Sequence, residues 1–232
     1  MIRYLVCLYL VLMLSSHAHA IQSDLDGHVY DSNTNQLIYI EKHRVSSVDG
    51  RHVMTSNYLD IEDNQIATRE VVFEDDLVTE YKLSQPQIEY QEFISRGDNK
   101  IEMTEIDRGQ VRQTNIRETH LQQVVIDAGF SNFIVRNWDQ LLSGSKLKFK
   151  FASPSQMKAI NFEVKLASNV DGVLLFNMTV ANPLIKLLIK PIKVGFNETT
   201  KELAYYKGIS NLQDSQGKYY KVEIKYKKEL NS

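Results

Sequence analysis

Two stretches decide the fold: residues 147–151 (LKFKF) and residues 220–226 (YKVEIKY), in which apolar and charged side chains alternate. Residues 160–166 and 174–180 alternate in the same way. A period of two is typical of β-strands with one face in the core and the other in water. Asp171-Gly172 joins two of these stretches, and Asp-Gly is a strong hairpin signal. The second half therefore predicts an antiparallel meander.

The first half predicts further strands, with more polar faces. Several carry charge on both faces, as in Thr68-Arg69-Glu70, so their register is weakly specified and we expect them at the periphery. Polar turns such as Val48-Asp49-Gly50 separate them. The predicted strands cover residues 28–31, 36–47, 52–60, 65–74, 78–83, 87–95, 100–107 and 110–118.

One segment has helical spacing instead. Its apolar residues recur at i, i+3, i+4, i+8, i+11 and i+12 from Phe130, which predicts one main amphipathic helix. Asp127 or Ser131 could cap its start, and Gly144 stands where a C-terminal glycine belongs. A second, short helix is expected over residues 183–189, because Pro183 suits a first turn and Pro191 prevents extension.

Residues 1–20 have the layout of a cleaved signal peptide. Arg3 precedes an apolar run of residues 4–14, which is shorter than the roughly 20 residues of a membrane-spanning helix, and an Ala-x-Ala sequence ends at Ala20. We expect export to the periplasm, cleavage after Ala20, and a single β-rich domain over residues 21–232. The single cysteine, Cys7, lies in this signal, so the mature chain has neither disulfides nor cysteine-ligated metal.

Charge is distributed unevenly along the mature chain. Residues 21–120 carry 10 basic and 20 acidic side chains, whereas residues 121–232 carry 16 basic and 9 acidic ones. Such an asymmetry can mark a basic face for an anionic lipid or an acidic protein. It can also mean that the two halves attract each other within one fold. Nucleic acid is an improbable partner in an exported protein.

From Asp127 onward the chain resembles a family of uncharacterised exported proteins of Gram-negative bacteria. The resemblance rests on Asp127-Ala128-Gly129-Phe130, Asn137-Trp138, Phe149-x-Phe151-x-x-Pro154-Ser155, Pro191-Ile192 and Gly208-Ile209-Ser210-Asn211-Leu212. Tyr39-x-Glu41-x-His43 adds weak support in the first half. That family is similar in layout to the half-open β-barrels of the lipoprotein-carrier group, which implies a curved antiparallel sheet wrapped around one main and one short helix. The resemblance supplies no catalytic residues.

Three sets of residues are candidates for a binding site. Aromatic side chains from separate elements could line an apolar cavity, or could simply form the core: Trp138, Phe149, Phe151, Phe162, Phe176, Phe196 and Tyr205. Lysines could meet anionic headgroups or a membrane surface: Lys146, Lys148, Lys150, Lys186 and Lys190. Tyr39, Glu41 and His43 share one strand face and could hold a polar headgroup or transfer a proton, or could be an exposed face with cross-strand hydrogen bonds.

These observations favour a periplasmic binding protein for a hydrophobic or lipidated ligand, acting in envelope maintenance or transport. A protein-interaction module of the envelope, docking through its acidic strands near Glu89 and Glu92, is the first alternative. An enzyme acting through Glu41 and His43 is the second. We expect no catalytic activity, cofactor or metal, because no catalytic motif and no metal-ligand spacing is present. The mature chain has no segment long enough to span a membrane.

Overall fold

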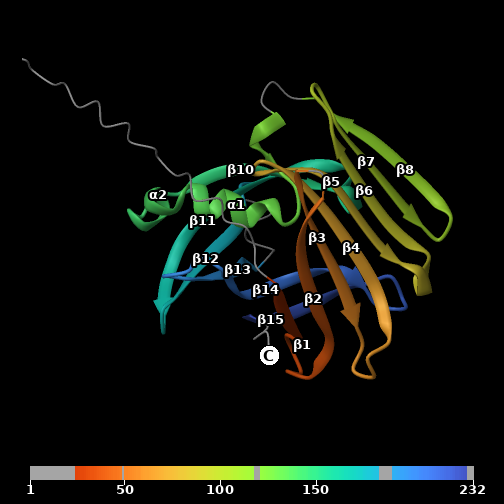
Figure 1. The fold of residues 1–232 in the computed structure, drawn as a ribbon, viewed down its shortest axis with the longest axis horizontal. Coiled ribbons are helices and arrows are strands. Elements are labelled where there is room, and N and C mark those ends of the chain that lie inside the picture. Colours follow the sequence, from red (N-terminus) through yellow and green to blue (C-terminus); the bar gives the residue numbers. More distant parts are fainter. Residues whose placement is uncertain (1–23, 49, 118–120, 183–189, 229–232) are drawn as a thin grey trace, which may run out of the picture.

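The computed structural model describes residues 24–48, 50–117, 121–182 and 190–228. They form one 15-stranded sheet in the order β8-β7-β6-β5-β4-β3-β2-β1-β15-β14-β13-β12-β11-β10-β9. Every pairing is antiparallel except that of β9 with β10, which is parallel. Figure 1 shows this sheet curving round the helices. The predicted fold, mainly β with a curved antiparallel sheet, is confirmed.

The strands of the first half lie close to their predicted bounds, and that of residues 65–74 coincides with the prediction. Alternation set these bounds correctly because each strand turns every second side chain inward. The last residue of the strand predicted over residues 110–118 lies outside the described residues. These strands are β1 (Leu25–Asp31), β2 (Leu37–Val48), β3 (Arg51–Leu59), β4 (Gln65–Glu74), β5 (Leu77–Gln85), β6 (Tyr90–Arg96), β7 (Ile101–Asp107) and β8 (Gln110–Ile116).

The second half contains the helices and the remaining strands. Asp171 and Gly172 both have positive φ, 51° and 78°, as a two-residue hairpin turn requires, and Val170 pairs with Val173 across it. The elements are β9 (Val124–Val125), α1 (Gly129–Arg136), α2 (Trp138–Leu142), β10 (Leu147–Ser153), β11 (Lys158–Val170), β12 (Val173–Val180), β13 (Ile192–Asn197), β14 (Leu203–Gln213) and β15 (Tyr219–Lys228). Short 3₁₀ turns cover Pro86–Ile88, Leu121–Gln123 and Pro154–Gln156.

The main helix differs from its prediction because it is broken at Asn137. This residue has φ −107° and ψ 20°, and its Nδ2 donates to the Phe133 carbonyl at 2.8 Å. Asparagine side chains compete in this way for backbone carbonyls, so α1 ends and α2 begins here. Neither proposed cap is used: the residue before α1 is Ala128, which makes no side-chain capping bond. The predicted short helix of residues 183–189 lies outside the described residues.

The core consists of two clusters. One joins the inner faces of the first-half strands to β14 and β15, and its buried members include Val29, Tyr58 and Leu83. The other joins α1 and α2 to β10–β13, and includes Trp138 and Phe176. The expectation that the first-half strands are peripheral is therefore wrong. Their inner faces mix polar with apolar side chains, so hydropathy alone underestimates how deeply they are buried.

The sheet does not close into a barrel: no ladder joins its end strands β8 and β9 within the described residues. Side chains bridge the gap instead. Arg96 on β6 donates to the carbonyls of Leu121 and Val124, the latter at 2.6 Å. Arg112 on β8 donates to the Ser155 carbonyl at 3.1 Å. The two ends of the sheet are thus held together by arginine-to-carbonyl bonds rather than by strand pairing.

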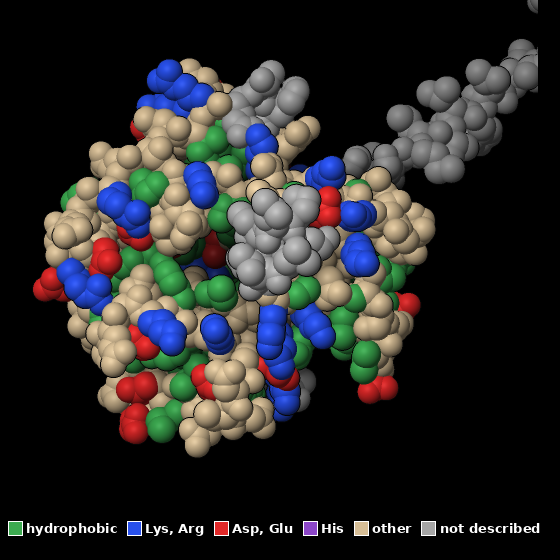
Figure 2. All heavy atoms as spheres, turned by 180° about the vertical axis from the view of Figure 1, so that it is seen from behind, with side chains coloured by type: hydrophobic (Ala, Val, Ile, Leu, Met, Phe, Trp, Pro, Cys, Tyr) green, Lys and Arg blue, Asp and Glu red, His purple; other side chains and the backbone are tan. Residues whose placement is uncertain are grey.

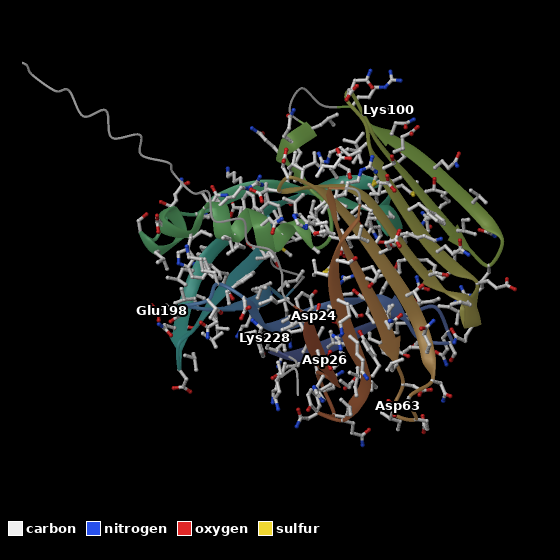
Figure 3. The ribbon with its side chains drawn as sticks, in the orientation of Figure 1. Asp24, Asp26, Asp63, Lys100, Glu198 and Lys228 are labelled. Atoms are coloured by element: carbon white, nitrogen blue, oxygen red, sulfur yellow. The ribbon has the colours of Figure 1, made fainter. Side chains whose placement is uncertain are left out.

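Hairpin tips carry charge and point away from the interior. Figure 3 shows Asp63, Lys100 and Glu198 at the tips of three different connections. Among the described residues, no helix is both long enough and apolar enough to cross a bilayer.

Candidate functional site

Strand β2 turns Tyr39, Glu41 and His43 to the inside of the curved sheet. They stand at alternate positions, so one face of the strand carries all three. Their exposed fractions are 1%, 5% and 5%. The interpretation of this row as an exposed strand face is therefore wrong, and the row is part of the interior.

His43 joins two strands through both of its ring nitrogens. Its Nε2 lies 3.0 Å from Glu41 Oε2, and its Nδ1 lies 2.7 Å from Ser56 Oγ. Ser56 is the residue directly opposite His43 in the β2–β3 ladder, so the register of the hairpin fixes this contact. Glu41, His43 and Ser56 thus form a continuous row of hydrogen bonds.

An ion pair that sequence reasoning missed extends this row. Arg69 on β4 donates from Nη2 to Ser56 Oγ at 3.1 Å and from Nη1 to Asp127 Oδ1 at 3.3 Å. Asp127 comes just before α1 and has φ 39°. A signal was present, because Arg69 occupies the same strand face as the buried Ala67 and Val71. A charge on an otherwise apolar face needs a buried partner. We call Glu41, His43, Ser56, Arg69 and Asp127 the interior network.

Tyrosines surround the interior network. Tyr226 on β15 donates to Glu41 Oε2 at 3.2 Å, and Tyr39 shares a 2.7 Å hydrogen bond with Ser210. Burial raises the pKa of Tyr226, and the neighbouring Glu41 carboxylate raises it further. The pKa of Tyr206 is raised by burial and then by Glu41 and Asp127. These phenols therefore stay neutral and act as hydrogen-bond donors.

Two atoms of the interior network lack a hydrogen-bond partner among the described residues: Arg69 Nε and Asp127 Oδ2. Arg69 Nη1 lies 3.1 Å from Asp127 Oδ2, but this contact is not aligned as a hydrogen bond. Buried polar atoms in native proteins are almost always paired, with protein, water or ligand. The interior network thus has one donor and one acceptor without an aligned hydrogen bond among the described residues.

A hollow opens on the face opposite to that of Figure 1. Figure 2 shows it near the centre of this face, with hydrophobic side chains around the opening and an acidic side chain on its floor. The side chains of Arg69 and Asp127 keep exposed fractions of 13% and 16%, which are larger than those of Glu41 and His43. They are therefore the members of the interior network that a small molecule could reach most easily.

The row of Ser56, His43 and Glu41 contains the residue types of a hydrolytic triad, but the serine is not presented to a substrate. Ser56 is 1% exposed, and its Oγ lies between His43 Nδ1 and Arg69 Nη2. A nucleophile needs an open approach to its oxygen atom. The arrangement can hold a polar group or transfer a proton. Within the described residues, no three His, Cys, Asp or Glu side chains are grouped to hold a metal ion.

A second polar cluster lies on the inner faces of β5, β6 and β7. Glu92 accepts hydrogen bonds from Tyr81 at 2.9 Å and from Tyr90 at 2.6 Å, and it stands opposite Glu105 in the ladder. Arg112 forms an ion pair with Glu105. Burial raises the pKa of Glu92 to about 7. Because Glu92 is 6% exposed, its predicted place on a docking surface is wrong, whereas the nearby Glu89 is exposed.

The aromatic candidates of the second half mostly pack against one another. Trp138 and Phe176 have ring centroids 5.8 Å apart, and the two residues are 5% and 0% exposed. Phe151 is partly buried beside this cluster. Tyr205 lies on the opposite face of β14 from Tyr206, which packs against both clusters. The structure therefore brings five candidates into one packed cluster: Trp138, Phe149, Phe162, Phe176 and Phe196.

The lysine candidates lie away from that cluster. Lys148 and Lys150 alternate with the inward Phe149, so they point to the outer face of β10. Lys146 and Lys148 lie 3.2 and 4.0 Å from Glu163 on β11. Lys190 is exposed, and Lys186 lies outside the described residues. The described lysines are thus not placed around the aromatic residues that they were expected to serve.

Comparison with known proteins yields a structural likeness only. No protein-family model matches the chain, and no curated protein matches it. The structure is similar to the crystal structure of a β-barrel-like protein of the domain of unknown function DUF1849 from Brucella abortus, with a TM-score of 0.48 and 9% sequence identity. The match covers 89% of this chain and 97% of that one.

Proposed function

We propose that this chain is an exported binding protein that holds an amphipathic ligand, such as a lipid or a lipidated molecule, inside its curved sheet. The polar part of the ligand would contact Arg69 and Asp127, and its apolar part would lie against the hydrophobic side chains around the opening of the hollow. Export to the periplasm and a role in envelope maintenance or transport belong to this proposal. Their support is the signal-like sequence of residues 1–20.

The unpaired atoms of the interior network carry this proposal. Arg69 Nε is a donor and Asp127 Oδ2 an acceptor, and neither has a hydrogen-bond partner among the described residues, although Asp127 Oδ2 lies 3.1 Å from Arg69 Nη1 in their ion pair. A ligand group with a carbonyl and a hydroxyl or amide would pair with both atoms. Each such hydrogen bond to a charged group stabilises by about 1.5–3 kcal/mol when it replaces an unpaired buried atom. Without a ligand, the interior network would not gain the stabilisation that hydrogen bonds to these two atoms provide.

Native mass spectrometry of the exported protein, purified gently from the periplasm, tests the proposal. We expect a bound mass that lipid extraction assigns to an amphipathic molecule. The paired substitution Arg69→Met with Asp127→Asn removes both charges together, and asparagine tolerates the positive φ of position 127, so we expect the fold to be retained and the bound mass to be abolished. Arg51→Met is the matched control, because Arg51 is half exposed and its ion pairs among the described residues are with the surface glutamates Glu74 and Glu80.

Two outcomes would contradict the proposal. One is a ligand-free mass that stays unchanged after incubation with envelope lipids. The other is full binding by the paired variant, with a far-ultraviolet circular dichroism spectrum like that of the wild type. Trp138 is the single tryptophan of the chain and lies in the apolar cluster, so a change in its fluorescence on binding would show that the ligand also alters the packing of this cluster.

A further inference from the structure

A groove of 480 Å³ crosses the outer face of strands β4–β8, on the opposite side of the sheet from the interior network. Consecutive residues of β4 point to the two faces in turn. Val71 points inward, into the core, and Val72 points outward and forms part of the groove. A strongly twisted sheet is hollow on its outer face as well as on its inner one. This volume falls within the range of about 300–1,000 Å³ that is usual for small-molecule sites.

The groove has an apolar floor and polar walls. Phe93 and Val72 contribute apolar surface, and Lys82 Nζ lies 5.8 Å from the centroid of the Phe93 ring. Hydroxyl and amide side chains from β6, β7 and β8 stand around them, together with three carboxylates and one ammonium group. The walls are therefore net acidic and rich in groups that bind hydroxyls. They include Glu70, Glu80, Glu102, Thr104, Gln113 and Asn115.

Part of the hydrogen-bonding capacity of these walls is unused, although Glu102 accepts a hydrogen bond from Lys100 at 2.8 Å. Within the described part of the chain, the side chains of Glu70, Gln113 and Asn115 make no hydrogen bond or ion pair. Glu80 has one distant contact, 3.8 Å from Arg51. Most polar side chains of the interior are bonded to one another, as with Glu92 and its two tyrosines. The groove thus offers amides and a carboxylate that are available to a ligand.

We propose that this groove binds an oligosaccharide that carries amino groups. Planar amides and carboxylates can each bond two neighbouring hydroxyls of a sugar, with the amides both donating and accepting, and an aromatic ring can pack against the C–H face of a sugar ring. Glu102 and Glu80 have cationic neighbours in Lys100 and Arg51, so Glu70 is the groove carboxylate left without an ion pair among the described residues, and it favours a cationic amino sugar over an anionic one. This site is independent of the proposed interior function, because it lies on the other face of the sheet.

Isothermal titration of the purified full-length gene product with three probes tests this assignment. They are the tetrasaccharide of glucosamine, its fully N-acetylated counterpart, and tetralysine. We expect saturable binding of the glucosamine tetrasaccharide, weaker binding of the acetylated one, and weaker binding of tetralysine. The double substitution Gln113→Ala with Asn115→Ala should weaken the first by about tenfold or more, since it removes at least two hydrogen bonds.

Asn177→Ala with Thr179→Ala is the matched control. These partly exposed residues have the same two-residue spacing on the outer face of β12, which contributes no residue to the groove, and their loss should change the affinity by less than about twofold. Absence of saturable binding by both tetrasaccharides overturns the assignment. So does unchanged binding in the groove variant. Equal or tighter binding of tetralysine, lost in the same variant, would overturn it in favour of a docking surface for cationic peptides.

Discussion

The two core clusters use the same strand geometry with different chemistry. In the cluster around Trp138 and Phe176, an apolar alternation in sequence becomes an apolar packed interior. In the cluster around Tyr58, the inward positions also include Glu41, which is bonded to His43 and Tyr226, and Arg69, which is bonded to Ser56 and Asp127. This difference shows that the burial of a side chain is set by its position in the curved sheet. Hydropathy predicts that burial correctly only where the interior is apolar.

Phe176→Ala should give the largest effect, because it leaves a cavity in the apolar cluster. Phe176 is 0% exposed and contacts the rings of Trp138 and Phe196. We expect the free energy of unfolding to fall by about 3–5 kcal/mol. Urea denaturation followed by Trp138 fluorescence measures it. A loss below about 1 kcal/mol would mean that this cluster is loosely packed and that the contrast between the two regions is false.

Glu92 should make the stability of the polar region depend on pH. Burial raises its pKa in the folded state to about 7, above its ordinary value. The folded protein therefore holds this proton more tightly than the unfolded chain. The resulting stabilisation is complete below the unfolded pKa and is lost as pH rises through 7. Relative to Glu92→Gln, the wild type should lose about 3 kcal/mol between pH 4 and pH 9.

Urea denaturation of both proteins across that pH range measures the difference. Glu89→Gln is the control, because Glu89 is exposed on the neighbouring turn. A difference between wild type and Glu92→Gln that stays constant with pH would show that Glu92 is solvated.

Asp127→Ala should destabilise the polar region by leaving Arg69 without its carboxylate. The pair is partly exposed, at 13% and 16%, so we expect a loss of about 2 kcal/mol rather than the full cost of a deeply buried charge. Arg69→Met in the Asp127→Ala background should recover most of it, because no unpaired charge then remains. A double-mutant cycle by urea denaturation measures the coupling. Independent, additive losses would show that the two residues do not act as a pair.

Lys148→Gln should give the smallest effect. Lys148 is 78% exposed and lies 4.0 Å from Glu163, and exposed pairs of this kind contribute little. We expect a change below about 0.5 kcal/mol in the free energy of unfolding. Thermal denaturation at low and high salt checks it. A larger, salt-dependent change would show that the outer lysines stabilise the sheet.

Parts of the candidate site could be predicted from the sequence, and parts could not. Tyr39, Glu41 and His43 could be placed on one strand face because that requires only a period of two. The burial of these three residues could not be predicted, because polar side chains are expected to be exposed unless their bonding partners are known. Those partners come from distant segments: Arg69 lies on β4 and Asp127 lies before α1. Only the curvature of the sheet brings them together.

The sequence by itself determined the strand periods, most strand bounds and the hairpin at Asp171-Gly172, because these depend on neighbours along the chain. Tertiary structure alone decided that the polar faces of the first-half strands lie inside, where the helix breaks at Asn137, and how Arg96 and Arg112 join the open ends of the sheet. It also decided that Glu92 is buried while Glu89 is exposed. Burial and pairing depend on contacts between residues far apart in sequence, and local patterns carry no record of those contacts.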